Sequence, residues 1–183
     1  IVRTVSLGSA VHVVFGFDLL DTGDYVISGA GPTPKLALFV VDSTGKLQSS
    51  YLAIGGYTRG NPVEPGVWQA ITVTSVATDG VSAFVTLSTF DSLWTVDTKS
   101  RRVVAGAVPN ADYQPPAAPT KSFTTRNERR DWATSQQVTT VFASPGHLLV
   151  PFFRGTYNQG AVSDVAYRRA GGGWETYRSM PTI

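Results

Sequence analysis

The sequence predicts an all-β protein built from many short strands. Valine occurs 23 times and threonine 21 times, against 11 leucines and four lysines, and β-branched residues favour strands over helices. Ten of the 13 acidic residues are aspartates, whose short carboxylate bonds nearby backbone amides in turns. With 183 residues, of which 42% are hydrophobic, we expect a single domain spanning 1–183.

Charge and composition narrow the function classes. Fifteen basic and 13 acidic residues give a net charge of +2, which does not favour nucleic-acid binding. The absence of cysteine excludes disulfides, thiolate nucleophiles and Cys-ligated metal centres. No apolar run reaches the roughly 18 residues of a membrane span. The chain begins at Ile1, so we expect a removed leader or a piece of a longer product.

A short pattern repeats along the chain. Phe39–Ser43 and Trp94–Thr98 both read aromatic, any residue, Val, Asp, hydroxyl, and they lie 55 residues apart. A glycine turn precedes each copy, at Asp21-Thr22-Gly23 and at Thr78-Asp79-Gly80. A fainter third copy begins at Ser144-Pro145-Gly146. Repeats of this length indicate one supersecondary unit per copy.

Each copy predicts a four-stranded antiparallel meander. The expected strands are 11–20, 24–29, 35–42 and 46–53, then 69–78, 82–89, 92–97 and 102–108, and finally 137–143, 147–154, 162–169 and 174–179. The repeats as a whole span about 11–60, 67–108 and 137–183. Lys35–Val41 and Ser82–Leu87 are almost continuously apolar, which is typical of strands buried on both faces. We therefore expect sheets that stack face to face.

Two segments stand outside the meanders. Residues Ile1–Leu7 alternate as a strand does and predict a single leading strand. Residues 109–136 form a long insertion with Pro115, Pro116 and Pro119, which preclude a ladder strand there. We expect a short helical turn around Asn127–Ala133.

The repeat resembles the blades of β-propellers, most closely the six-bladed NHL and TolB-like groups. The turn Thr78-Asp79-Gly80 and the segment Leu38–Lys46 match the family's D-G turn and its third strand ending in Asp-x-x-Gly-Lys. The resemblance implies a partial propeller of about three blades plus an N-terminal strand, about half of a six-bladed ring. An unclosed ring exposes an apolar face at each end, so we expect a second half-propeller as partner, from another copy or from the same parent polypeptide. The alternative fold is a β-sandwich or jelly roll of about twelve strands.

No catalytic or metal-binding cluster is evident in the sequence, and we predict no cofactor. We interpret His12 and His147 as a strand and a turn histidine, and Asp42 and Asp97 as turn-forming residues rather than a carboxylate pair. The resemblance extends to calcium-dependent propeller lactonases, which carry Asn and carboxylate ligands between blades. The positions to compare are Asn61, Glu64, Asn110 and Asp112.

The long insertion is the predicted contact surface, because aromatic and arginine side chains are enriched where proteins meet partners. The predicted ligand-binding residues are Tyr113, Arg129, Arg130, Trp132 and Tyr157. We therefore expect a non-catalytic, extracytoplasmic module that binds a protein or a small ligand. Two alternatives stay open: a calcium-dependent lactonase-like hydrolase, and a sugar-binding sandwich that stacks sugars on Trp68, Trp94 or Trp174.

Overall fold

The computed structural model describes residues 6–31, 35–55, 74–154 and 161–178, and the protein is all-β with one helix among these residues. Its strands form three antiparallel sheets. The N-terminal sheet holds β1 (Val13–Leu19), β2 (Tyr25–Ala30), β3 (Lys35–Val41) and β4 (Leu47–Gly55). The middle sheet holds β5 (Thr74–Thr78), β6 (Ser82–Leu87), β7 (Ser92–Asp97) and β8 (Arg102–Ala107). The C-terminal sheet holds β9 (Gln137–Thr139), β10 (Phe142–Ser144), β11 (His147–Arg154), β12 (Ala161–Arg169) and β13 (Trp174–Arg178).

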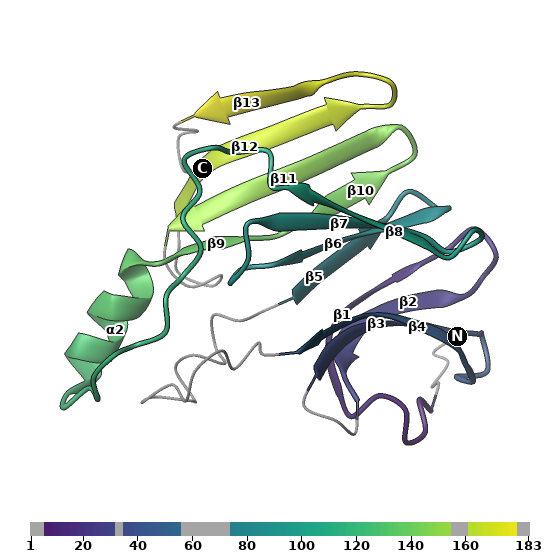
Figure 1. The fold of residues 1–183 in the computed structure, drawn as a ribbon, viewed down its shortest axis with the longest axis horizontal. Coiled ribbons are helices and arrows are strands. Elements are labelled where there is room, and N and C mark those ends of the chain that lie inside the picture. The colour runs from purple at the N-terminus through teal and green to yellow at the C-terminus, as the bar shows by residue number, and fades with distance from the viewer. Residues whose placement is uncertain (1–5, 32–34, 56–73, 155–160, 179–183) are drawn as a thin grey trace, which may run out of the picture.

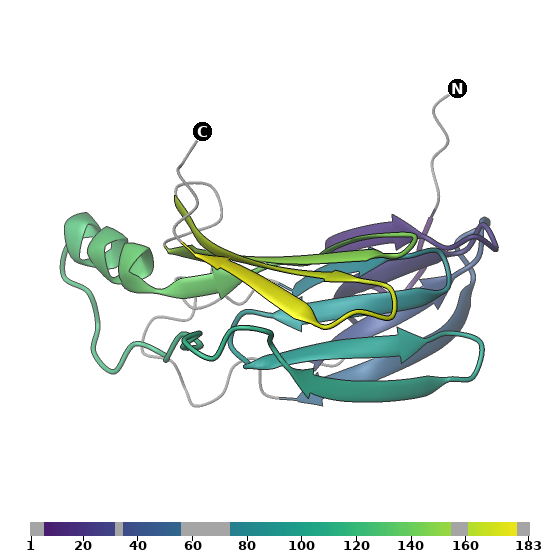
Figure 2. The ribbon, with the colours of Figure 1, turned by 90° about the horizontal axis from the view of Figure 1, so that it is seen from above.

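Each sheet is a meander of consecutive strands. The strand orders are β1-β2-β3-β4, β5-β6-β7-β8 and β10-β11-β12-β13, with β9 also paired to β11. The three sheets follow one another in space as they do in sequence (Figure 1), and Figure 2 shows the same succession from above. In a jelly roll, strands alternate between two facing sheets. The described strands do not, so the alternative sandwich topology does not apply to them.

The middle sheet is buried on both faces. Its Ala83, Val85 and Leu87 pack against the N-terminal sheet in one apolar cluster. Phe84, which points the other way, packs with Phe152 and others of the C-terminal sheet in a second cluster. Successive side chains of a strand alternate between faces, so the near-continuous apolar run in 82–87 supplies both interfaces. The prediction of stacked sheets is confirmed here.

Polar side chains on the first strands join neighbouring sheets. The carboxylate of Asp18 in β1 accepts a hydrogen bond of 2.8 Å from the backbone N–H of Thr78 in β5. Ser75, also in β5, shares a hydrogen bond of 2.6 Å with the Thr140 hydroxyl, and its oxygen accepts one of 3.2 Å from the N–H of Val141. The same kind of contact thus links the first sheet to the second and the second to the third.

The outer face of the N-terminal sheet is covered by the chain that precedes β1. Leu7, Ala10 and Val11 pack there against Ile27 and Phe39. A Cβ on Gly29 in β2 would overlap the carbonyl oxygen of Val13. Gly29 therefore allows a close approach of two strands, in the glycine-rich segment 29–31.

Two predicted elements differ in detail. The expected strand 137–143 is split into β9 and β10, because Thr140 lies opposite Pro151, which has no N–H to complete the ladder. The expected leading strand lies mostly outside the described residues, and Ser6 and Leu7 are not in a strand.

Candidate functional site

The insertion begins with a segment that is fixed between two sheets. Tyr113 is 6% exposed, and its ring lies 5.3 Å from that of Phe152 between ring centroids. Its hydroxyl donates a hydrogen bond of 2.5 Å to the carbonyl of Ser88. Burial, with a smaller contribution from Asp91, raises the pKa of the Tyr113 phenol. Tyr113 thus joins the middle and C-terminal sheets and does not lie on the surface of the insertion.

Asn110 and Asp112 anchor the same segment to the C-terminal sheet. The side-chain amide of Asn110 donates to Asp164 at 3.1 Å, and its oxygen accepts from the N–H of Asp112 at 3.0 Å. The Asp112 carboxylate pairs with Arg178 at 2.7 Å. No group of three or more His, Cys, Asp or Glu that could hold a metal ion occurs in the described residues. Asn61 and Glu64 lie outside them.

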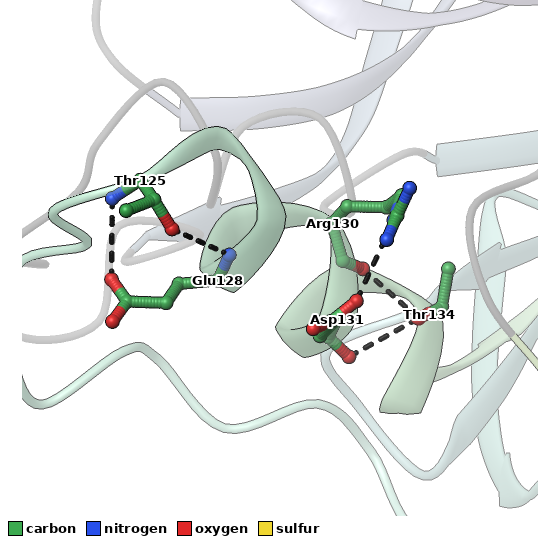
Figure 3. Close-up of polar contacts among 5 residues, drawn as sticks. All are labelled: Thr125, Glu128, Arg130, Asp131 and Thr134. Atoms are coloured by element: carbon green, nitrogen blue, oxygen red, sulfur yellow. Dashed lines mark hydrogen bonds and ion pairs between the residues drawn. The ribbon is translucent and has the colours of Figure 1, made fainter.

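The helix of the insertion, α2 (Arg126–Ser135), is longer than the expected turn around Asn127–Ala133. The N-cap Thr125 accepts a hydrogen bond from the N–H of Glu128, and the Glu128 carboxylate accepts one in return from the N–H of Thr125 (Figure 3). Hydrogen bonds from the backbone and hydroxyl of Thr124 lower the pKa of Glu128. This capping box satisfies backbone donors that the first turn leaves without partners.

Trp132 holds α2 against the rest of the protein. Its ring lies 5.7 Å from that of Phe123, and the side chain packs with Ala118, Val138 and Phe153. Trp132 is half-buried, and α2 has no fully buried residue. The helix therefore extends from the end of the sheet stack with most of its surface exposed (Figure 1).

Three arginines form what we call the basic face of α2: Arg126, Arg129 and Arg130. All three are exposed, and their i, i+3, i+4 spacing places them side by side on one face of the helix. The contact of 3.5 Å between Arg130 and Asp131 joins two exposed side chains, so it holds Arg130 only weakly.

The basic face lies where helix electrostatics disfavours it. Arg126 is the first residue of α2, and Arg129 and Arg130 are the fourth and fifth. The N-terminal end of a helix carries partial positive charge and favours acidic side chains. Helix stability therefore gives no reason for three arginines in this half of α2. An external anionic partner does give one.

The predicted site is brought together only in part. Arg129, Arg130 and Trp132 share α2, whereas Tyr113 is buried elsewhere and Tyr157 lies outside the described residues. Sequence reasoning missed Arg126 as a member, although its helical spacing from Arg129 and Arg130 could have revealed it. The basic face, with Trp132 beside it, is thus the candidate contact surface.

The repeated aspartates have the turn-forming role predicted for them. Asp42 accepts hydrogen bonds from the hydroxyl and N–H of Thr44 and from the N–H of Lys46, and these lower its pKa from 3.8 to about 2. Asp97 accepts from the N–H groups of Lys99 and Ser100 in the equivalent turn, and its pKa is lowered too, mainly by the bond from Ser100. Both carboxylates close turns, as expected.

The histidines and tryptophans singled out from the sequence lie apart from α2. His12 is exposed just before β1, and His147, at the start of β11, has its Nδ1 2.7 Å from the Tyr167 hydroxyl. Trp94 is buried between the N-terminal and middle sheets, and Trp174 is partly buried beneath Arg168. Trp68 lies outside the described residues. Neither described tryptophan offers an open stacking platform for a sugar.

Comparison with known proteins adds no relative to this picture. No family model matches the chain, and a search of curated proteins finds no match either. In the described part of the chain, no helix is long and apolar enough to cross a membrane.

Proposed function

We propose that this protein is a non-catalytic binding module of the β-propeller type, and that the basic face of α2 engages a partner bearing carboxylate or phosphate groups. The observation that carries the proposal is the placement of Arg126, Arg129 and Arg130 together on an exposed helix, against the preference of the helix dipole. Guanidinium groups bind carboxylates and phosphates through paired hydrogen bonds. The stacked sheets serve as the rigid support for this helix.

Replacing the basic face should remove binding without harming the fold. In the variant Arg126→Gln/Arg129→Gln/Arg130→Gln, we expect affinity for a labelled oligo-glutamate peptide to fall at least about tenfold, which corresponds to roughly 1.4 kcal/mol shared by three contacts. Fluorescence anisotropy at low salt measures the affinity, because salt screens exposed charges. The melting temperature should stay within a degree or two, since none of the three is buried.

The control removes two other exposed arginines. Arg101→Gln/Arg102→Gln changes the turn between β7 and β8 and the start of β8, and we expect it to bind the peptide as the unaltered protein does. Equal affinity of the triple variant and the unaltered protein would reject the basic face as the contact surface.

We further propose that a second copy of this chain covers the two end faces of the sheet stack. On the N-terminal sheet, Phe17 is 68% exposed and Leu19 is 52% exposed, both on the face turned away from the middle sheet. On the C-terminal sheet, Phe142 and Tyr177 are about half exposed on the corresponding outer face. Apolar surface at both ends suits a complementary half, and two sets of three sheets would give the six of the family that the sequence resembles.

Light scattering after size-exclusion chromatography tests this pairing. We expect twice the mass of one chain, and the variant Phe17→Ser/Phe142→Ser should shift the mass to that of one chain, because it removes one apolar group from each end face. A single-chain mass for the unaltered protein at high concentration would contradict self-pairing.

A further inference from the structure

A small cavity opens where the middle and C-terminal sheets meet, at the end that carries the turn between β10 and β11. Its volume is about 100 Å³, and its lining includes Asp79, Phe84, Gly146, Leu148, Arg168 and Arg169. One water molecule takes up about 30 Å³ in the liquid, so the cavity has room for one small molecule. It lies apart from α2, which packs against Val138 and Phe153 instead.

Arg168 occupies a position that is apolar in the neighbouring sheet. It is the last residue but one of β12, pairs with Leu148 and lies on the same face as Ala166, which packs against the middle sheet. Val96 has the matching place as the last residue but one of β7, on the face toward the preceding sheet, and is 0% exposed. The C-terminal sheet thus carries a charge where its neighbour carries a fully buried valine.

The arginine has an aromatic support but no acidic partner in the described part of the chain. Its guanidinium carbon lies 4.8 Å from the ring centroid of Trp174, an arrangement that orients the guanidinium. No described carboxylate forms an ion pair with it. A partly buried charge without a counter-charge costs stability, so packing alone does not explain why arginine stands here.

Asp79 defines the opposite character of the same cavity. Its Oδ1 accepts hydrogen bonds of 3.0 and 2.8 Å from the N–H groups of Val81 and Ser82, which fix the carboxylate in the turn before β6. A fixed carboxylate repels a doubly charged phosphate but accepts a hydrogen bond from a hydroxyl group. The cavity therefore pairs a positive group with a hydrogen-bond acceptor.

We propose that this cavity binds a small hydroxycarboxylate. Arg168, supported by Trp174, holds the ligand carboxylate through two parallel N–H···O hydrogen bonds. Asp79 accepts the hydrogen bond of the ligand hydroxyl. Phe84 and Leu148 supply the apolar wall that keeps the ligand small.

Lactate is the probe, with propionate and inorganic phosphate as comparisons. For a ligand of six heavy atoms we expect a dissociation constant of about a millimolar, which NMR titration detects. The indole Nε1–H resonance of Trp174 should shift with lactate and saturate. Propionate, which lacks the hydroxyl, and phosphate should each bind at least about tenfold more weakly. Equal binding of all three anions would overturn the proposed selectivity and with it the role of Asp79.

The decisive variant is Arg168→Val, which introduces the residue type of the matching position in the middle sheet. We expect it to fold with an equal or higher melting temperature and to lose lactate binding at least tenfold. Arg102→Gln, which removes an exposed arginine of β8, should bind lactate normally. The triple variant of the basic face should also do so, which separates this inference from the proposed function of α2. Saturable binding of lactate to Arg168→Val, or no shift of the Trp174 indole well above millimolar lactate, would overturn the proposal.

Discussion

Phe152→Ala should lower the free energy of unfolding by about 4 kcal/mol, the typical cost of truncating a buried phenylalanine. Phe152 is 1% exposed and packs between the C-terminal and middle sheets, where its ring contacts that of Tyr113. Removing the ring leaves a cavity between the two sheets and takes away the apolar support of Tyr113. Urea denaturation followed by tryptophan fluorescence measures the change.

The matched control is Phe142→Ala in the same sheet. Phe142 is 51% exposed on the outer face, so the same truncation there should cost less than about 1 kcal/mol in a single chain. Dilute protein keeps any pairing through that face out of the measurement. Similar losses for both variants would mean that the face of β11 toward the middle sheet is no more a core than the outer face, which contradicts the stacking.

The strands could be predicted because their signals are local. The glycine turns and the Asp-hydroxyl turns mark where hairpins reverse, and the observed β6, β7 and β8 begin at the predicted residues. The doubly apolar run in 82–87 also revealed that this sheet has a neighbour on each side. In each case a short stretch of sequence determines the structure.

Other features depend on contacts between distant residues. The break between β9 and β10 arises because Thr140 meets Pro151 across the sheet, and nothing in 137–143 alone announces it. The length of α2 depends on the capping box of Thr125 and Glu128 and on the packing of Trp132. The propensity of a ten-residue segment is a weak guide to such a helix.

The candidate site shows the same division. Arg129 and Arg130 could be singled out from composition because they stand in a charge-rich insertion, but Tyr113, from the same insertion, is buried by its contacts with Ser88 and Phe152. Composition does not distinguish an aromatic side chain that meets a partner from one that fills a core. Arg168 was not identified at all, because its significance depends on comparison with Val96 in the folded sheets.

Cysteines in place of Ser75 and Thr140 should form a disulfide that joins the first strands of two successive sheets. The two hydroxyl oxygens are 2.6 Å apart, so paired thiols at these positions are within bonding reach. Mild oxidation should crosslink nearly all molecules and raise the free energy of unfolding by about 4 kcal/mol, as expected for a loop of this length. The chain has no other cysteine, so any intramolecular disulfide joins these two positions.

This crosslink tests the succession of sheets most directly, because Ser75 and Thr140 meet only if the first strand of the middle sheet lies beside that of the C-terminal sheet. The control pair joins Thr140→Cys with Ser100→Cys, in the turn between the two outer strands of the middle sheet. Mass spectrometry of the oxidised protein, with and without reduction, gives the yield for each pair. We predict a nearly complete disulfide for positions 75 and 140 and little for 100 and 140. Equal yields, or free thiols at 75 and 140, would contradict three sheets packed in sequence order with their first strands adjacent.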